Sequence, residues 1–300
     1  MKTKIFALFF LLFSAGFVRG QATNEALLRI ADRYWMQPDV VYASANNTPL
    51  KLDVWYPRDN PNPTPTLVYI HGGGWIFGSK EGAVYQLLPY LEKGWRVVNV
   101  EYRMAGNSLA PAAVEDTRCA LRWVYRNAKQ YNFDTSKIVL TGHSAGGHLS
   151  LITGMLPDGT PLDNNCYADE KYGDVKMKVA AIINWYGITD VNDVIQGPNL
   201  KNYAAMWMGS MPNASEVAKK VSPLTYVRTD LPPVITIHGD KDDVVPYSHA
   251  TRLQEALDKA KVPNKLVTVK NGGHGMFQLN EYSTAFDEIW KFLKENKITQ

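Results

Sequence analysis

Short apolar runs recur along most of this chain, and they constrain its fold more than any other feature of the sequence. Each run is five to seven residues long, is rich in β-branched residues and is followed by turn-forming residues. Apolar residues at consecutive positions indicate strands that are covered on both faces, as in a parallel sheet. Six runs are expected as strands: residues 66–70, 96–100, 137–141, 179–185, 233–238 and 264–269.

Segments with helical periodicity separate these runs. Three of them are expected as helices: residues 113–130, 249–261 and 283–294. Strands and helices in alternation predict the α/β class, with a doubly wound, mostly parallel β-sheet flanked by helices. A short helix and then a β-hairpin are expected before this pattern: residues 24–35, followed by 40–43 and 50–55.

One stretch interrupts the alternation. Residues 187–230 contain no clean strand and are rich in Asn, Met, Trp and Pro. They follow the strand expected at 179–185, which is the sixth along the chain when the two hairpin strands are counted. We expect a small cap-like insertion over the sheet, with a substrate-facing role and ordinary core packing as the two alternatives. The sequence has no internal repeat, so residues 21–300 are expected to form a single domain.

The first 20 residues have the pattern of a secretory signal peptide. Lys2 and Lys4 precede an apolar stretch of 14 residues, and Val18 and Gly20 are small residues before a cut at Gln21. The stretch is shorter than the roughly 20 residues that a membrane span needs. We therefore expect cleavage, a secreted or periplasmic protein, and no stable membrane insertion of the mature chain.

The charge distribution argues against nucleic acid as a partner. The chain has a net charge of +3, but its first 20 residues hold three bases and no acid, which leaves 29 charges of each sign. The sequence contains no run of Lys and Arg of the kind that follows a phosphate backbone.

Two cysteines, Cys119 and Cys166, are too few for a disulfide framework and belong to no C-x-x-C motif. We expect Cys119 to be buried on a helix and Cys166 to lie unpaired in a loop. A disulfide between them in an oxidising compartment is the alternative.

A nucleophile motif follows the strand expected at 137–141. The letters GHSAG at 142–146 match G-x-S-x-G and open a helical segment. This strand–turn–helix context is what a nucleophile elbow requires, because the tight turn needs small residues two positions before and after the serine. The motif predicts Ser144 as a nucleophile.

A serine hydroxyl needs a base and an acid, and both have candidates after later strands. The loop GGHG at 272–275 offers His274 as the base, with a surface histidine as the plain alternative. The loop HGDKDDVVP at 238–246 offers Asp242 as the acid, with Asp240 and Asp243 as fallbacks and Asp190 as a more remote candidate. The order serine, aspartate, histidine is the order of α/β-hydrolases.

A glycine-rich segment, HGGGW at 71–75, directly follows the first expected strand of the sheet. Its main-chain N–H groups, together with that of Ala145, could hold the oxyanion of a tetrahedral intermediate. A phosphate-binding loop is the alternative, but neither of its glycine patterns is present. His143 and His148 are spaced five apart, which does not fit a metal pair on a helix, so neither a metal nor another cofactor is expected.

Taken together, HGGGW, GHSAGG, HGDKDDVVP and GGHG make the chain resemble the HGGG-type esterases of the α/β-hydrolase fold. It looks most similar to the hormone-sensitive-lipase-like group and to secreted bacterial feruloyl and acetyl xylan esterases. The resemblance implies oxyanion donors at Gly73, Gly74 and Ala145. It also implies Asp242 as the acid, since the following Val-Pro sets the register.

The function expected from these residues is a serine esterase that acts through an acyl-enzyme on small or carbohydrate-linked, acetyl or feruloyl, esters. Trp75, Trp185 and Trp207 are candidates for a substrate pocket, with core packing as the alternative. A prolyl-oligopeptidase-like peptidase and a non-catalytic binding protein on the same fold are the competing functions.

Overall fold

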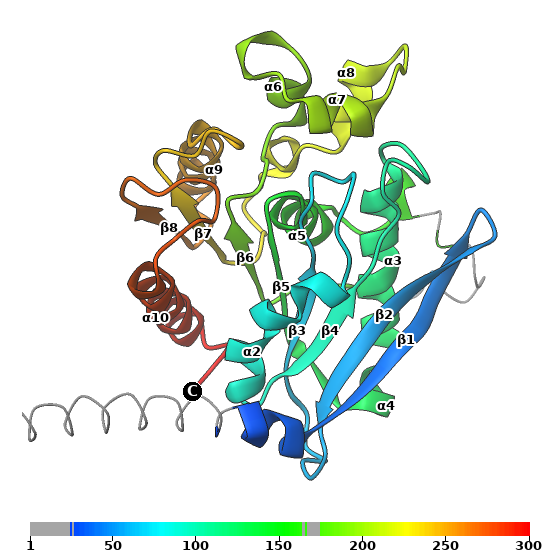
Figure 1. Cartoon of the computed structure of the whole chain (residues 1–300), viewed down its shortest axis with the longest axis vertical. Helices are drawn as coiled ribbons and strands as arrows, with labels where there is room; N and C mark the ends of the chain where they lie inside the picture. Colours follow the sequence, from blue (N-terminus) through cyan, green and yellow to red (C-terminus); the bar gives the residue numbers. More distant parts are fainter. Residues whose placement is uncertain (1–24, 26, 164–165, 167–174) are drawn as a thin grey trace, which may run out of the picture.

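The computed structural model describes residues 25, 27–163, 166 and 175–300, so the expected signal peptide lies outside the described residues. A single eight-stranded sheet runs through the molecule in the order β1-β2-β4-β3-β5-β6-β7-β8 (Figure 1). The strands are β1 (Tyr34–Ala45), β2 (Thr48–Pro57), β3 (Thr64–Ile70), β4 (Arg96–Val100), β5 (Phe133–His143), β6 (Ala181–Trp185), β7 (Val234–Gly239) and β8 (Asn264–Val269).

The sheet is mostly parallel, as the sequence predicts. β1 pairs antiparallel with β2, and β2 pairs antiparallel with β4. All other neighbours run parallel, from β4 through β3, β5, β6 and β7 to β8. The expected doubly wound α/β class is therefore confirmed. Since parallel strands end at one edge, the loops after β3, β5, β7 and β8 meet there.

Alternate side chains of each central strand enter two separate cores. In β3, Val68 and Ile70 belong to the core under α3, α5 and α9, whereas Leu67 and Tyr69 belong to the core under α2 and α10. Both faces of the sheet are thus covered by helices. This burial explains why the strands appear in the sequence as continuous apolar runs.

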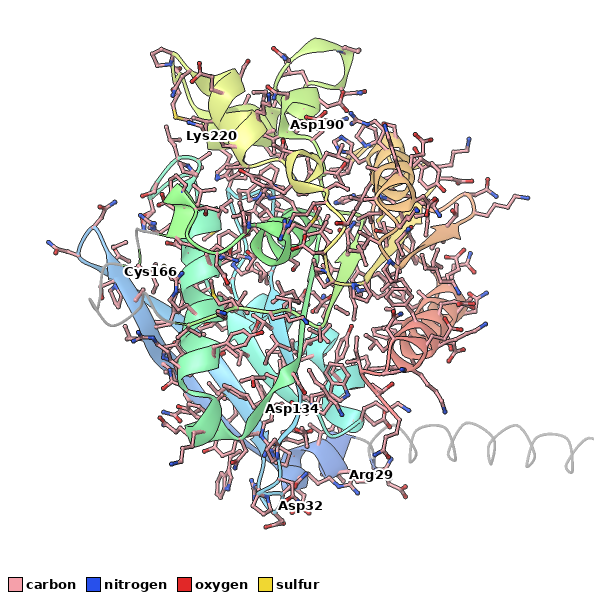
Figure 2. All side chains as sticks on the ribbon, turned by 180° about the vertical axis from the view of Figure 1, so that it is seen from behind. Arg29, Asp32, Asp134, Cys166, Asp190 and Lys220 are labelled. Carbon is pink, nitrogen blue, oxygen red and sulfur yellow. A yellow bond between two sulfur atoms is a disulfide. The ribbon has the colours of Figure 1, made fainter. Side chains whose placement is uncertain are left out.

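The helices connect successive strands, and several short ones lie beyond the sheet edge. The longer helices are α2 (Val84–Glu92), α3 (Ala112–Arg126), α5 (Ala145–Met155), α9 (Ser248–Lys259) and α10 (Leu279–Glu295), and the short α4 (Ala128–Tyr131) follows α3. Between β6 and β7 lie α6 (Val191–Ile195), α7 (Asn202–Met208) and α8 (Ala214–Lys220). In Figure 2, Asp190 and Lys220 mark this insertion at the end of the molecule opposite Asp134, near the start of β5. No helix within the described ranges is both long and apolar enough to cross a membrane.

Several elements differ from expectation, among them three helices. The first helix, described at 25 and 27–33, ends at 33 and not at 35, because Tyr34 already pairs with β2. The helix expected over 113–130 breaks at Asn127 into α3 and α4. No helix was expected at α2, where Pro89 lies inside the helix and hides the periodicity.

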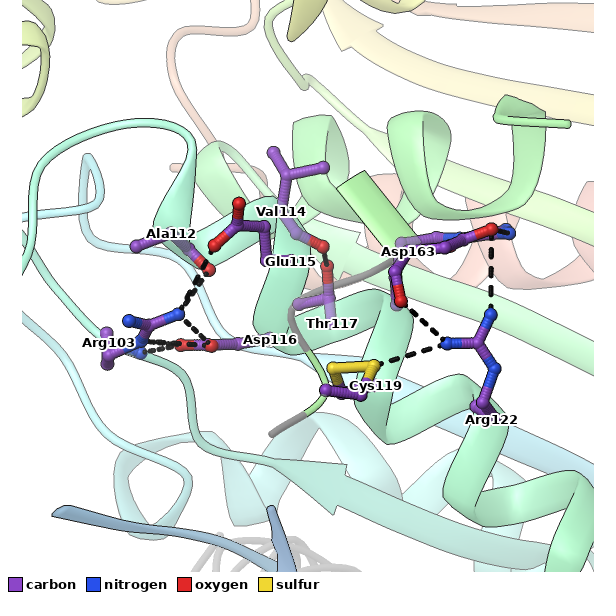
Figure 3. The surroundings of a disulfide bond; sticks show 11 residues. Arg103, Ala112, Val114, Glu115, Asp116, Thr117, Cys119, Arg122 and Asp163 are labelled. Atoms are coloured by element: carbon purple, nitrogen blue, oxygen red, sulfur yellow. Dashed lines mark hydrogen bonds and ion pairs between the residues drawn. A yellow bond between two sulfur atoms is a disulfide. The ribbon is translucent and has the colours of Figure 1, made fainter. Parts of the chain in front are cut away.

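The expectation that the two cysteines remain unpaired is wrong. Cys119 on α3 and Cys166 form a disulfide with a Cα–Cα distance of 5.3 Å. Arg118, also on α3, binds the Asp163 carboxylate. Arg122 donates to the Asp163 carbonyl (Figure 3). These contacts hold the chain before Cys166 against the helix. This buried ionic contact lies next to the disulfide and joins segments about 45 residues apart, a proximity that cysteine spacing does not reveal.

Candidate active site

Ser144 lies on a strained turn between β5 and α5. Its φ and ψ are 56° and −119°, a conformation that is unusual for a residue with a side chain. A Cβ atom at Gly142 or Gly146 would overlap the carbonyl oxygen of Ile70 on β3. The glycines of the motif therefore allow β3 to pass directly beside the turn, as a nucleophile elbow requires.

His274 joins Ser144 to Asp242. Its Nε2 lies 2.9 Å from Ser144 Oγ, and its Nδ1 lies 2.7 Å from Asp242 Oδ2. The three residues come from loops that follow β5, β7 and β8. We call residues 239–246 the acid loop and residues 270–275 the histidine loop. The structure thus brings together the three residues that the sequence predicts as a triad.

The Asp242 carboxylate is bound on both oxygens. Oδ1 accepts hydrogen bonds from the backbone N–H groups of Val244 and Val245 at 2.9 and 2.8 Å. Oδ2 accepts from His274 and lies 3.2 Å from His238 Nε2. Burial by itself would raise the pKa of Asp242, but the hydrogen bonds from His238 and His274 outweigh burial and hold the pKa well below its usual range.

The other acid candidates have different partners. Asp240 accepts a hydrogen bond from the backbone N–H of Asn271, and the carbonyl of Asp243 accepts one from Lys201 Nζ. Asp190 binds Arg252. None of these three carboxylates contacts His274 among the contacts of the described residues.

The glycine loop, residues 71–80, lies against the serine turn. A Cβ at Gly72 would lie 2.6 Å from the carbonyl oxygen of His143 and 3.7 Å from Ser144 Cβ, so only glycine fits this approach. Gly73 and Gly74 have φ values of +117° and +60°, which favour glycine. No described residue accepts a hydrogen bond from the N–H groups of Gly73, Gly74 or Ala145. These donors are therefore available to a ligand.

Glu101, which directly follows β4, holds the glycine loop at both ends. Its Oε1 lies 3.1 Å from His71 Nε2, and its Oε2 accepts the backbone N–H of Lys80 at 2.9 Å. The buried Lys80 ammonium in turn contacts three carboxylates at 2.7 to 3.0 Å, those of Asp39, Asp53 and Glu81. Neither Glu101 nor His238 was expected in the site, although Glu101 directly follows an expected strand and His238 is the last residue of another.

The insertion contacts both the glycine loop and the acid loop. Tyr203 on α7 packs against Gly74, and its hydroxyl donates to the carbonyl of Val244 at 3.3 Å. Trp75 Nε1 donates to Nδ1 of the buried His148 at 3.1 Å, and His148 Nε2 donates to the Val221 carbonyl at the end of the insertion. Burial lowers the pKa of His148 to about 4, so its ring is neutral at physiological pH.

The three tryptophans proposed as pocket residues lie in the packed interior. Trp75 and Trp207 stack at 4.2 Å, Trp185 stacks on His143 at 5.1 Å, and all three are at most 1% exposed. A cavity of about 460 Å³ does adjoin the serine turn, but none of these tryptophans lines it. These three side chains therefore belong to the core, where their large apolar surfaces are buried.

Residues on both sides of Ser144 line this cavity, among them Gly72, His143 and Tyr186. Its far wall is formed by α2 and by Tyr282 and Phe286 of α10. Among the described residues, no three His, Cys, Asp or Glu side chains are placed to share a metal ion.

Comparison with known proteins places the chain among esterase-like sequences. The BD-FAE family profile matches residues 52–257. The chain is 30% identical over 78% of its length to "Esterase LipC" of Mycobacterium tuberculosis, and 29% identical over 77% to "Probable carboxylic ester hydrolase LipM" of the same organism. It spans only 59% and 54% of the length of these two relatives.

Solved structures resemble the chain over more of their length. A "truncated form of carbohydrate esterase from gut microbiota" has a TM-score of 0.73 and 26% identity, with 88% of this chain and 97% of that chain covered. The butyrate-bound esterase Est2 of Thermogutta terrifontis has a TM-score of 0.71 and 28% identity, with 86% and 93% covered.

Proposed function

The chain belongs to the BD-FAE family of α/β-hydrolases, and from this premise we propose that it is a serine carboxylic-ester hydrolase with Ser144, His274 and Asp242 as its catalytic triad. The observation that carries the proposal is the continuous contact from Ser144 Oγ through both ring nitrogens of His274 to Asp242, at 2.9 and 2.7 Å. Relatives named as esterases support the same reaction class.

In the proposed mechanism, Ser144 Oγ attacks the ester carbonyl carbon while His274 Nε2 takes the hydroxyl proton. Asp242 keeps the other ring proton on Nδ1 and stabilises the imidazolium ion. The carbonyl oxygen becomes an oxyanion, which the free N–H groups of Gly73, Gly74 and Ala145 would bind. The intermediate then expels the alcohol, which takes the proton from His274 and leaves an acyl group on Ser144.

Water completes the cycle. His274 removes a proton from the water as the water attacks the acyl carbonyl. When the second tetrahedral intermediate collapses, His274 returns this proton to Ser144 Oγ and the acid departs. Both halves require a neutral His274 at the start.

The proposed substrates are small esters or acetyl and feruloyl esters linked to carbohydrate. A structural neighbour described as a carbohydrate esterase supports this class. The cavity beside Ser144, at about 460 Å³, is large enough for an aromatic acyl group. We further propose residues 21–300 as one domain, with residues 187–230 as its cap-like insertion.

Secretion is the remaining part of the proposal. The first 20 residues have the charged and apolar regions of a cleaved signal peptide. The disulfide between Cys119 and Cys166 supports an oxidising destination outside the cytosol, where such bonds persist.

Hydrolysis of p-nitrophenyl acetate and butyrate by the wild type and by Ser144→Ala tests the reaction class. The proposal expects turnover by the wild type alone and labelling of the wild type by a fluorophosphonate. Turnover that survives in Ser144→Ala would overturn the assignment of the nucleophile. Faster cleavage of peptide than of ester substrates would instead favour a peptidase.

A further inference from the structure

The cavity beside Ser144 has mainly apolar walls but contains two polar atoms that no described residue engages. Its walls include the rings of Tyr186, Tyr282 and Phe286 and the pyrrolidine of Pro89. Such walls suit a flat, apolar group of a substrate. The two polar atoms, on His143 and Tyr186, decide which group of that shape is preferred.

The first polar atom is Nε2 of His143. The Tyr69 hydroxyl lies 2.9 Å from His143 Nδ1 and has no other partner among the described residues. Burial raises the pKa of Tyr69, so the phenol keeps its proton and donates it to Nδ1. Burial and the nearby His274 lower the pKa of His143 to about 3, so this ring is neutral. The neutral ring therefore carries its proton on Nε2.

Nε2 is open to a ligand. No described residue contacts it as a hydrogen-bond partner, and it is not among the buried side-chain atoms left unsatisfied in the described chain. Since His143 lines the cavity, its Nε2–H can donate to a group bound there.

The second polar atom is the hydroxyl of Tyr186. The ring of Tyr186 lies between His143 and His274, with ring centroids at 5.6 and 4.7 Å. No described residue forms a hydrogen bond with its hydroxyl, which is likewise absent from the buried unsatisfied atoms. Tyr186 has a φ of +40°, a strained value for an aromatic residue, and such strain is concentrated at functional sites.

We propose that His143 and Tyr186 are specificity-determining residues, which select esters whose cavity-bound aromatic acyl group carries an oxygen substituent over hydrocarbon analogues of the same shape. Tyr69 is the positioning residue, since it places the His143 proton on Nε2. The inference rests on the proposed ester hydrolysis. It adds to that function the two polar atoms, His143 Nε2 and the Tyr186 hydroxyl, that recognise the acyl group.

The size of the preference follows from hydrogen bonding. A substrate oxygen would satisfy donors that lose their water when the acyl group binds, whereas an ethyl group in its place would leave them unpaired. We expect the oxygen-bearing ester to be favoured by about 10- to 100-fold in kcat/KM.

The test compares methyl 4-methoxycinnamate with methyl 4-ethylcinnamate, which differ by one oxygen in place of a CH₂ group. The ratio of their kcat/KM values cancels any difference in the amount of folded enzyme. His143→Phe and Tyr186→Phe should each reduce the ratio several-fold, and Tyr69→Phe should reduce it less. Tyr282→Phe is the matched control, because this hydroxyl lines the same cavity but already donates to the Gly275 carbonyl.

The outcomes separate this inference from the proposed function. A wild type that hydrolyses p-nitrophenyl acetate but shows a ratio near one, or cleaves neither cinnamate, overturns the inference alone. An unchanged ratio in Tyr186→Phe and His143→Phe does the same, and Tyr186→Phe suffices where His143→Phe does not fold. A wild type that cleaves no ester and resists fluorophosphonate overturns the proposed function and this inference with it.

Discussion

The two sides of the serine turn are held in place by different forces. On one side, the glycine loop is anchored by charged groups: Glu101 binds both its ends, and the Lys80 ammonium contacts three carboxylates. On the other side, Asp242 is held by two backbone amides and two histidines.

The charged groups on the two sides have different roles: on one side they position the glycine loop, and on the other they take part in proton transfer. The charges that anchor the glycine loop lie at its ends, so they hold backbone donors in place without entering the reaction. The charge on the other side is Asp242 itself, which contacts the proposed base. Substitutions on the first side should therefore change transition-state binding, and those on the second side should change proton transfer and its pH dependence.

Ser144→Ala removes Ser144 Oγ, the proposed nucleophile, which lies between the two sides. This substitution should have the largest effect on activity. We expect kcat/KM for p-nitrophenyl butyrate to fall by about 10⁴- to 10⁶-fold, as for other serine nucleophiles. Circular dichroism and the unfolding midpoint should stay close to those of the wild type. A loss below about 10-fold would show that another nucleophile acts.

Asp242→Asn tests the acid loop, and Asp240→Asn is its matched control two residues away. Asparagine at 242 can hold His274 in the wrong tautomer, so kcat should fall by about 10²- to 10⁴-fold. Asp240→Asn should remain within a few-fold of wild type, because this carboxylate binds Asn271 and not His274. Equal losses in the two variants would contradict the assignment of Asp242.

Glu101→Gln tests the glycine loop. The amide oxygen can still accept from the Lys80 N–H, but the negative charge beside His71 Nε2 is lost, so the loop amides lose part of their alignment. We expect kcat to fall by about 10- to 100-fold with little change in KM, comparable to the partial loss of an oxyanion donor. Glu81→Gln, at an exposed carboxylate on Lys80, is the control and should be nearly silent. A change confined to KM would contradict this role.

Acid should destabilise the link between the glycine loop and the insertion. The pKa of His148 is about 4 in the folded chain, against 6.5 for an ordinary histidine, because its ring is buried. The unfolded chain therefore binds more protons between these values, and stability is lost as the pH falls from 6.5 to 4. For this residue the loss amounts to roughly 2–4 kcal/mol at pH 4.

Urea unfolding across this pH range measures the effect. His148→Gln, which can still accept from Trp75 and donate to the Val221 carbonyl, should give a shallower pH dependence than wild type. His143 and His249, whose pKa values burial lowers to about 3 and 4, continue to contribute. An identical slope in His148→Gln and wild type would contradict a buried neutral His148.

The disulfide should matter least for activity. Cys119→Ser with Cys166→Ser opens a loop of 47 residues and should lower the free energy of unfolding by about 2–4 kcal/mol. kcat/KM should stay within about two-fold of wild type, since no residue of the serine turn contacts the disulfide. A large loss of kcat/KM in folded protein would show coupling between the disulfide and the site.

The parts of the site that local sequence patterns determine could be predicted. Ser144 occupies a motif that only a strand–turn–helix context satisfies, and His274 follows the last strand in a glycine-rich loop. Asp242, Asp240 and Asp243 are close in sequence, so the path of one loop decides between them. In the structure the Asp242 carboxylate contacts His274, whereas Asp240 and Asp243 have other partners.

The remaining contacts depend on chain paths that no local pattern encodes. Glu101 meets His71 across 30 residues, and His238 joins the triad acid only because the acid loop turns back on its own strand. The sequence left a pocket and the core as alternatives for the three tryptophans, because a large aromatic residue near a motif suits both, and the structure buries all three. Tyr186, beside Trp185 in sequence, lines the cavity that Trp185 does not.

The sequence by itself determined the alternation of strands and helices along the chain, the doubly wound sheet class, and the order of serine, aspartate and histidine. Apolar periodicity and turn residues are local patterns that extend over a few positions, so they can be recognised from the sequence alone. Only the tertiary structure decided the anchoring of the glycine loop, the disulfide and the walls of the cavity. These depend on side chains that lie far apart in sequence and are brought into contact by the packing of the whole sheet.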